Sequence, residues 1–391
     1  MNPSQGPAPI LLLVPSLIRA GAETQAISLA NGLARQGFAV HLATFGEPLD
    51  QLKEIDRARV VFHRLQRRGR LGWSLVGDLV RLVRTHRFAV IHCTLQISLF
   101  YASLARWLIA QRDKPELVVA IHTTQNLSAR EDRFDRWLYR PLIRRCARTI
   151  FVCQAQAAYW IQRFPELKSR ATVVYNGVDA ERFSPTPTQE AAARALRASL
   201  SIAADAPVLL CVARLRPEKG HLLLLRALAG QARVHLVLAG DGAMRRQIEA
   251  QRQALDLQAR VHLLGDVADT RPLYALADAS VLASTSVETF SMAMLESLAM
   301  RTPVIATRIG GMGEAIETAK TGWLVPVGDA PALAEAIAEL AADLPRAARL
   351  GVNGRARVRE SFTVQAMVRD TAVILREVGP ASAPAGGSLT A

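Results

Sequence analysis

Residues 280–296 read SVLASTSVETFSMAMLE, and this stretch contains a strand, a loop and the start of a helix. Residues 280–283 form a short apolar run, typical of a parallel strand buried on both faces. Glu288 falls in the loop that follows. A helix beginning near Ser291 carries Glu296 about a turn and a half inside it, at ~1.5 Å per residue. The stretch therefore predicts a strand–helix unit with two carboxylates beyond the end of its strand.

The same alternation of short apolar runs and helical stretches continues along the whole 391-residue chain. Such alternation predicts an α/β fold with doubly wound parallel sheets. The predicted strands are residues 10–14, 39–44, 60–65, 89–93, 117–121, 149–152, 172–174, 208–213, 234–239, 261–264, 280–283, 303–306 and 323–325.

The length of the chain predicts two Rossmann-like domains facing across a cleft, because ligands of open parallel sheets bind beyond the carboxyl ends of the strands. The first domain is residues 1–178 and the second is residues 207–379, with packing of the last helix back on the first domain as an alternative. Residues 179–206 are the predicted linker. Residues 380–391 are mostly Pro, Ala, Gly, Ser and Thr, and this composition predicts a disordered tail.

The composition restricts the class of protein. Half of the residues are hydrophobic and 21% are charged, which excludes a disordered chain. No apolar run reaches the ~18 to 20 residues of a membrane-spanning helix, and the polar start before residues 10–14 lacks the features of a signal peptide. The four cysteines lack zinc-ligand spacing. These features predict a cytoplasmic protein in a reducing compartment.

The net charge of +14 is concentrated in the first half of the chain. Residues 1–178 contain 25 Lys and Arg against 12 Asp and Glu, whereas the remaining residues contain 23 against 22. A one-sided basic domain indicates an acidic membrane surface or a nucleic acid as partner, unless the arginines merely form a solvated face. The stretch 130–148 combines basic residues with Phe134 and Trp137, which suits an anionic membrane surface. Its arginines are Arg130, Arg133, Arg136, Arg140, Arg144, Arg145 and Arg148.

Two loops have features of phosphate-binding sites. Gly21 lies in a small-residue loop that opens a predicted helix, and backbone N–H groups at a helix N-terminus attract anions. The loop is not a G-x-G-x-x-G motif, so a nicotinamide or flavin site is poorly supported. Arg214 and Lys219 follow the strand 208–213 near another helix N-terminus, where two cations can hold a diphosphate without a metal ion. The alternatives are a tight turn at Gly21 and a surface ion-pair cluster with Glu218.

Several motifs in a fixed order carry a resemblance to a known family. They are the Gly21 loop, residues 176–179 (Asn-Gly-Val-Asp) with Phe183, residues 214–220, residues 240–242 (Gly-Asp-Gly), residues 288–296, and residues 308–311 (Arg-Ile-Gly-Gly) with Glu314. In this order and spacing the chain resembles the retaining GT-B-fold glycosyltransferases of family 4, also called glycosyl transferases group 1. The resemblance implies that the first domain binds the acceptor and that the second binds a nucleotide sugar.

The resemblance also implies roles for individual residues. Arg214 and Lys219 would bind the donor diphosphate, Glu296 would bind the donor ribose, and Gly21 would approach the phosphates. Glu288 and the backbone after it would bind the transferred sugar. The remaining donor-binding residues are Gly240, Asp241, Thr289, Phe290, Ser291 and Met292.

His122 follows the predicted strand 117–121, and the resemblance implies that it contacts the donor sugar near the reacting carbon. A loop or structural histidine is the alternative reading, and His92, deeper in an apolar stretch, is the competing candidate. The candidate catalytic residues are His122, Glu288, Arg214 and Lys219.

The chain departs from the family pattern at two places. The first loop reads Gly21-Ala22 where the family has paired glycines, and residues 289–291 read Thr-Phe-Ser where the family has Gly-Phe-Gly. The replacements are small, so we expect the backbone contacts to persist. No Asp-x-Asp motif occurs, and no His, Cys or Asp cluster has metal-ligand spacing along the chain. We therefore expect an enzyme without cofactors and independent of metal ions.

The expected function is retaining transfer of a hexose or an N-acetylhexosamine from a UDP-sugar to a lipid-linked saccharide in cell-surface polysaccharide biosynthesis. The enzyme would lie peripherally on the inner face of the cytoplasmic membrane. One rival is another GT-B-fold enzyme, such as a sugar-nucleotide epimerase. The other is a basic nucleic-acid binder, but the basic half has no RNA motif or recognition-helix signature, so no nucleic-acid partner is expected.

Overall fold

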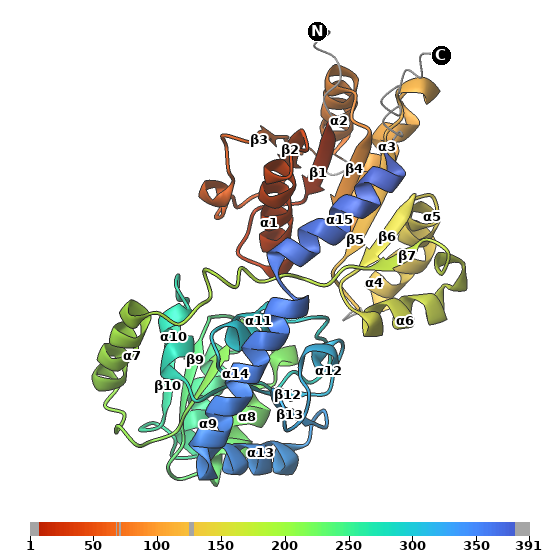
Figure 1. The fold of residues 1–391 in the computed structure, drawn as a ribbon. Helices are drawn as coiled ribbons and strands as arrows, with labels where there is room; N and C mark the ends of the chain where they lie inside the picture. Colours follow the sequence, from red (N-terminus) through yellow and green to blue (C-terminus); the bar gives the residue numbers. More distant parts are fainter. Residues whose placement is uncertain (1–7, 68, 70–71, 125–128, 380–391) are drawn as a thin grey trace, which may run out of the picture. The chain divides into compact units, whose positions relative to one another are not determined.

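The computed structural model describes residues 8–67, 69, 72–124 and 129–379, and the chain divides into two compact units (Figure 1). The first unit runs to Tyr175 and resumes at Val364, and the second unit is Asn176–Thr363. Each unit is built on one parallel β-sheet flanked by helices. The predicted α/β fold with two Rossmann-like domains is therefore confirmed. The predicted tail, residues 380–391, lies outside the described residues.

The sheet of the first unit has seven parallel strands in the order β3-β2-β1-β4-β5-β6-β7. All residues of β1 are buried, and alternate residues pack on opposite faces: Leu11 and Leu13 in one core cluster, Leu12 and Val14 in the other. A strand covered on both faces must be apolar at every position, which explains its continuous apolar run. The strands are β1 (Ile10–Val14), β2 (Val40–Thr44), β3 (Val60–Arg64), β4 (Val90–Thr94), β5 (Glu116–Ile121), β6 (Arg148–Phe151) and β7 (Ala171–Val173).

Helices cover both faces of this sheet. α1 and α15 pack together against the face that carries Leu12, whereas α2, α3 and α6 contribute to the core on the opposite face. The helices are α1 (Gly21–Arg35), α2 (Trp73–His86), α3 (Gln96–Trp107), α4 (Ala129–Phe134), α5 (Arg140–Ile143), α6 (Gln154–Arg163) and α15 (Val364–Val378), with the short turns η1 (Leu52–Glu54), η2 (Gln111–Asp113), η3 (Asp135–Tyr139, a π-helix) and η4 (Pro165–Leu167).

The sheet of the second unit has six parallel strands in the order β10-β9-β8-β11-β12-β13. They are β8 (Val208–Val212), β9 (His235–Ala239), β10 (Val261–Gly265), β11 (Ala279–Leu282), β12 (Val304–Thr307) and β13 (Gly322–Val325). In both sheets the strand order reverses beside the first strand of the unit. This reversal creates the switch point beyond which ligands of open α/β sheets bind.

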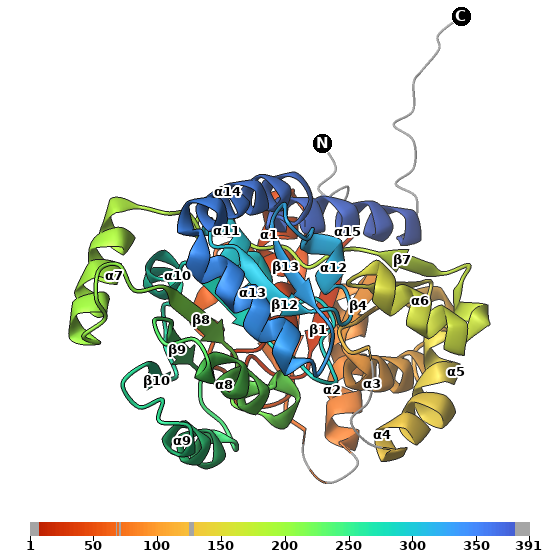
Figure 2. The same cartoon turned by 90° about the horizontal axis from the view of Figure 1, so that it is seen from below.

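The helices of the second unit are α7 (Pro187–Ser199), α8 (His221–Ala229), α9 (Arg245–Ala254), α10 (Arg271–Leu276), α11 (Met292–Ala299), α12 (Met312–Ala315), α13 (Ala330–Ala342) and α14 (Leu344–Ser361), with the 3-10 turn η5 (Pro217–Lys219). α8 and α13 pack against each other, and α11 packs against α14 (Figure 2). Side chains of Thr186, Ser291, Asp329 and Asp343 cap the N-termini of α7, α11, α13 and α14 by accepting backbone N–H bonds.

The sequence predicts the strands more accurately than the ends of the units. All thirteen predicted strands are present, and no end differs by more than one residue. The units, however, divide between Tyr175 and Asn176 rather than after residue 178. Residues 187–199 of the predicted linker form α7, which packs on α10 and so belongs to the second unit. The last helix, α15, belongs to the first unit.

Candidate functional site

The carboxyl ends of β8 and β11, which are neighbours in the second sheet, bring Lys219 and Glu288 together. Lys219 Nζ lies 2.7 Å from Glu288 Oε2, and the Ser284 hydroxyl donates to the same carboxylate oxygen at 3.0 Å. The side chain of Lys219 is 26% exposed and that of Glu288 is 11% exposed. Because this pair is shielded from most of the solvent, its geometry is more restricted than that of a surface ion pair.

Gly220 is the residue that allows Lys219 to reach this position. It has a left-handed φ of +68°, and a Cβ atom there would lie 1.9 Å from the carbonyl oxygen of Ala283. The backbone N–H of Thr285 donates to the carbonyl of Glu218 at 2.8 Å. The turn before α8 is therefore packed directly on the chain that leaves β11, which only a glycine permits.

The loop that carries Glu288 is supported by the Arg308–Gly311 motif, whose role the sequence alone did not indicate. Gly310 has a φ of +54°, and a Cβ atom there would lie 1.9 Å from the Glu288 carbonyl oxygen. Gly311 N–H donates to the carbonyl of Thr289 at 2.7 Å. Asn176, from another of the motifs, donates from Nδ2 to the carbonyl of Phe290 at 3.1 Å. These bonds fix the backbone of the predicted sugar-binding stretch.

Glu296 lies in α11, as predicted, and pairs with a tyrosine that sequence reasoning missed. The buried Tyr274 hydroxyl donates to Glu296 Oε2 at 3.0 Å. Burial raises the pKa of Glu296 to about 7, although the Tyr274 hydrogen bond and the charge of Arg182 act in the opposite direction. Ser291 begins the helix, and its hydroxyl accepts from the backbone N–H of Met294. The Glu296 carboxyl is thus held in one orientation, while burial still disfavours its ionised form.

The loop containing Arg214 packs against the Gly240–Asp241 loop. Both follow neighbouring strands, β8 and β9, and the Leu215 N–H donates to the Asp241 carbonyl at 3.0 Å. The Asp241 carboxylate accepts from Arg245 at 3.0 Å, so its charge is compensated within its own loop and helix. The structure therefore gathers the predicted donor-binding residues of the second unit at the carboxyl edge of one sheet.

His122 and Gly21 occupy the corresponding edge of the first sheet. His122 follows β5, and Gly21 is the first residue of α1, which follows β1. Burial, with the nearby His92, lowers the pKa of His122 to about 4, so its imidazole is neutral at neutral pH. His92 lies within β4 and is 3% exposed, and burial lowers its pKa to about 4 as well. The strand-end position supports His122 over His92 as the residue able to meet a ligand.

Gln156 is a positioning residue that the sequence did not reveal. Its fully buried Nε2 donates to the carbonyls of Ile121 at 2.9 Å and Thr123 at 3.0 Å, the residues on either side of His122. Its Oε1 accepts from the Val152 N–H at 2.7 Å. The side chain therefore joins the ends of β5 and β6 and sets the backbone that carries His122. In the sequence, Gln156 is an ordinary polar residue of a helix. Its role becomes visible only when β5 and β6 are known to be neighbouring strands.

The packing of Gly220 predicts a strong response to a single added methyl group. We expect Gly220→Ala to lower the free energy of unfolding by about 2 kcal/mol or more, because the residue is left-handed and the methyl group overlaps a carbonyl oxygen. Gly230→Ala is the matched control at the other end of α8. Its φ is −77° and nothing lies within 4 Å of its Cβ position, so we expect no loss. Urea unfolding measures both, and equal stabilities of the two variants would contradict this account.

Two family models match the chain, one in each half. The model described as Glycosyltransferase Family 4 matches residues 19–182, and the model described as Glycosyl transferases group 1 matches residues 193–357.

Curated relatives include glycosyltransferases named for lipopolysaccharide core biosynthesis, for phosphatidylinositol monomannoside and for D-inositol 3-phosphate. The chain is 35% identical over 171 residues to the lipopolysaccharide core biosynthesis glycosyltransferase LpsE of Rhizobium meliloti, covering 44% of this chain and 50% of the relative. It is 36% identical over 193 residues to a GDP-mannose-dependent alpha-(1-6)-phosphatidylinositol monomannoside mannosyltransferase of Mycolicibacterium smegmatis, covering 46% and 49%. The matches thus span about half the length of these relatives.

Solved structures match over almost the entire chain. Anabaena Alr3699/HepE in complex with UDP-glucose has a TM-score of 0.82 and 25% identity, covering 94% of this chain and 99% of that chain. Sucrose-phosphate synthase of Thermosynechococcus elongatus has a TM-score of 0.80 and 25% identity, covering 95% and 98%. With both halves matched by the family models and both sheets ordered as described above, the chain belongs to the GT-B-fold glycosyltransferases of family 4.

Proposed function

We propose that this chain is a retaining glycosyltransferase that transfers a sugar from a UDP-sugar to a hydroxyl group of a lipid-linked saccharide, without a metal ion. The observation that carries the proposal is the Lys219–Glu288 pair, with Ser284, at the carboxyl ends of β8 and β11. A cation and a carboxylate side by side suit a ligand whose diphosphate adjoins a sugar. The pathway would be cell-surface polysaccharide biosynthesis.

In this proposal the second unit binds the donor. Arg214 and Lys219 neutralise the diphosphate, which becomes more negative as it leaves, and this is the work that a divalent ion does in metal-dependent enzymes. Glu296 accepts hydrogen bonds from the ribose hydroxyls, as acidic residues do in other nucleotide sites. HepE has been solved with UDP and with UDP-glucose, which supports uridine as the base, while the GDP-mannose-dependent relatives make guanosine the alternative.

The proposed reaction exchanges one bond to the anomeric carbon for another on the same face of the sugar. The bond from this carbon to the diphosphate oxygen breaks, the bond to the acceptor oxygen forms, and the acceptor proton passes to the departing phosphate. Glu288 orients the transferred hexose or N-acetylhexosamine. His122, held by Gln156 and neutral at the working pH, hydrogen-bonds the sugar.

Product analysis with radiolabelled sugar nucleotides tests the proposal. Wild-type protein is incubated with UDP-, GDP- and ADP-sugars and with lipid-linked saccharide acceptors. We expect label from a UDP-sugar to enter the lipid fraction, and EDTA to leave the rate unchanged. A labelled epimer of the sugar nucleotide would instead indicate an epimerase. Loss of activity in EDTA with recovery in Mg²⁺ or Mn²⁺ would contradict metal independence.

Lys219→Ala should weaken donor binding by about 1 to 3 kcal/mol.

The raised pKa of Glu296 gives two pH dependences of opposite sign. The ionised carboxylate is the form that accepts from ribose, so donor affinity should fall as the pH drops below about 7. The folded-state pKa exceeds the ordinary value of 4.5, so the folded protein binds the proton more tightly. The contribution of Glu296 to the free energy of unfolding should therefore be most favourable below pH 4.5. It should decline by about 1 to 3 kcal/mol as the pH rises to 7.

Glu296→Gln should remove the part of each dependence that Glu296 contributes, because the amide does not titrate. The control is Glu335→Gln, an exposed carboxylate on α13. Titration calorimetry with UDP and urea unfolding, each between pH 5 and pH 8, provide the two curves. If both dependences were as steep in Glu296→Gln as in Glu335→Gln, the assignment to this carboxyl would be refuted.

The basic stretch of the first unit supports peripheral docking on an anionic membrane. Trp137 is 77% exposed and Phe134 is 44% exposed, so these aromatic rings are available to a membrane rather than buried in the core. Arg133 and Arg136 are exposed beside them. Pro141 does not end the helical path, which passes through the π-helical turn η3 into α5. Among the described residues, no helix has the length and apolar character needed to span a membrane.

Vesicle co-sedimentation tests this docking. We expect binding to anionic vesicles at 0.1 M salt and release at 1 M, where the Debye length falls from ~10 Å to ~3 Å. Each arginine near the surface contributes about 1 kcal/mol, so Arg133→Gln with Arg136→Gln should weaken binding about tenfold or more. The control removes two exposed arginines of the second unit, Arg194→Gln with Arg349→Gln. Equal binding to neutral vesicles, or equal loss in the control, would leave these arginines as a solvated face.

A further inference from the structure

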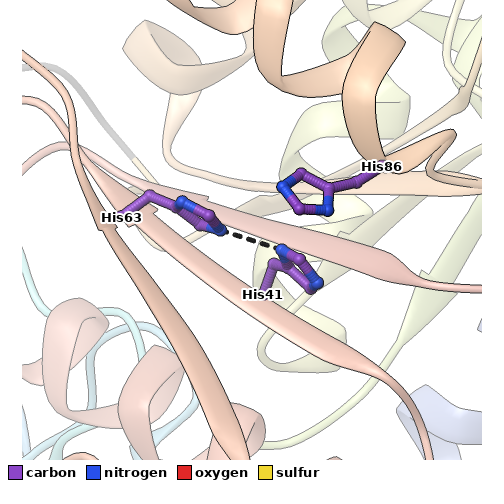
Figure 3. A group of neighbouring side chains, drawn as sticks. All are labelled: His41, His63 and His86. Atoms are coloured by element: carbon purple, nitrogen blue, oxygen red, sulfur yellow. Dashed lines mark hydrogen bonds between the residues drawn. The ribbon is translucent and has the colours of Figure 1, made fainter.

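Three histidines of the first unit, distant in sequence, come together outside the candidate site. His41 lies in β2, His63 in the neighbouring strand β3, and His86 is the last residue of α2. His41 Nδ1 lies 2.8 Å from His63 Nε2, and the His86 ring centroid is 4.4 Å from that of His41. Figure 3 shows the three imidazoles turned toward one another.

We propose that His41, His63 and His86 form a binding site for a transition-metal ion, with Zn²⁺ as the favoured ion. One ring nitrogen from each residue lies within 4.8 Å of the other two. Nitrogens that share a tetrahedral zinc ion at ~2.0 to 2.1 Å are separated by about 3.3 Å, so small rotations of the rings would suffice. Imidazole is the ligand that zinc, copper and nickel share, whereas Mg²⁺ and Ca²⁺ require oxygen ligands.

His41 is only 8% exposed, but His63 and His86 are half-buried, so an ion could enter from their side and a water molecule could complete the coordination. His41 also packs edge-on against Phe88, with ring centroids 4.9 Å apart, which limits the movement of its ring. Preorganised ligands lose less entropy when they bind. The cluster thus combines access from solvent with a restrained geometry.

The position of the cluster indicates a structural rather than a catalytic ion. His41 is near the start of β2, His86 ends α2 four residues before β4 begins, and His63, the fourth of the five residues of β3, contacts His41 through its side chain. Gly21 and His122 instead follow the carboxyl ends of their strands, whereas none of the three histidines lies beyond such an end. A bound ion would join the edge strand β3, its neighbour β2 and the end of α2. We therefore expect it to raise the stability of the first unit without entering the transfer reaction.

The second unit contains a natural control for this site. His235 in β9 and His262 in β10 also form a stacked pair, with Nδ1 and Nε2 3.2 Å apart and the ring planes at 6°. β9 and β10 hold the same places in the second sheet as β2 and β3 hold in the first. In the described part of the chain, however, only the first-unit cluster has three such ligands. Two imidazoles alone bind a metal ion more weakly than three. The His235–His262 pair therefore shows how two histidines in contact behave without a third ligand.

The experiment uses the full chain without a histidine tag, stripped of metal with EDTA and dialysed. Thermal unfolding is followed with ZnCl₂, with MgCl₂ and with no added metal, and zinc binding is measured by titration calorimetry. We expect Zn²⁺ to raise the midpoint in the wild type with one ion bound per chain, and Mg²⁺ to leave it unchanged. His63→Gln and His86→Gln should each remove the zinc-dependent shift, taken relative to the variant's own metal-free midpoint. His262→Gln should retain it.

Three results would overturn the proposal: no zinc-dependent shift or heat in the wild type, a shift that persists in His63→Gln and His86→Gln, or a shift lost equally in His262→Gln. The readout does not depend on the proposed enzyme activity. A protein that binds zinc at this cluster but fails to transfer sugar would contradict the proposed function alone. Conversely, activity that survives EDTA, together with a lower thermal midpoint, would agree with a structural ion.

Discussion

The carbonyl oxygen of Ala283 leaves no room for a side chain at Gly220, and the geometry of the second-unit site depends on that contact. The close approach holds the turn before α8 against the end of β11. Lys219 can then reach Glu288, and Glu288 in turn lies on a backbone that Gly310 approaches equally closely. Two glycines thus set the relative positions of a cation and a carboxylate that come from different strands. The adjacency of β8 and β11, produced by the reversal of strand order, is what makes such contacts available.

Each unit also contains titratable groups whose burial costs free energy. Glu296 lies where its charge is disfavoured, and the Tyr274 hydroxyl offsets only part of that cost. His122 and His92 lie in surroundings that disfavour their protonated forms. Perturbed groups of this kind concentrate at functional sites because the fold there favours binding geometry over its own stability. The large apolar cores around β1 and β8 tolerate this loss.

Local patterns predicted the strands and the order of the motifs, because a strand buried on both faces must be apolar wherever it lies. They also placed Glu288 in a loop and Glu296 in a helix, since both follow from counting residues after a strand. They could not show Gln156 beneath His122, Tyr274 beside Glu296 or the three clustered histidines. Those contacts depend on which strands are neighbours, and β2 and β3 bring together residues 22 positions apart. The place of residues 187–199 in the second unit was missed for the same reason, because the packing of α7 on α10 does not appear in local composition.

The first unit is interrupted in sequence by the whole second unit, and this affects the order of events during synthesis. Met367, Val368 and Leu375 of α15 complete the core against α1, where Gly32 leaves space for Val368. While the ribosome is still translating residues 176–363, the nascent first unit therefore exposes an unfinished apolar face. The second unit, which is continuous in sequence, can fold as soon as it emerges. A stalled or truncated chain that lacks residues 364–378 would consequently present that uncovered face to chaperones and proteases.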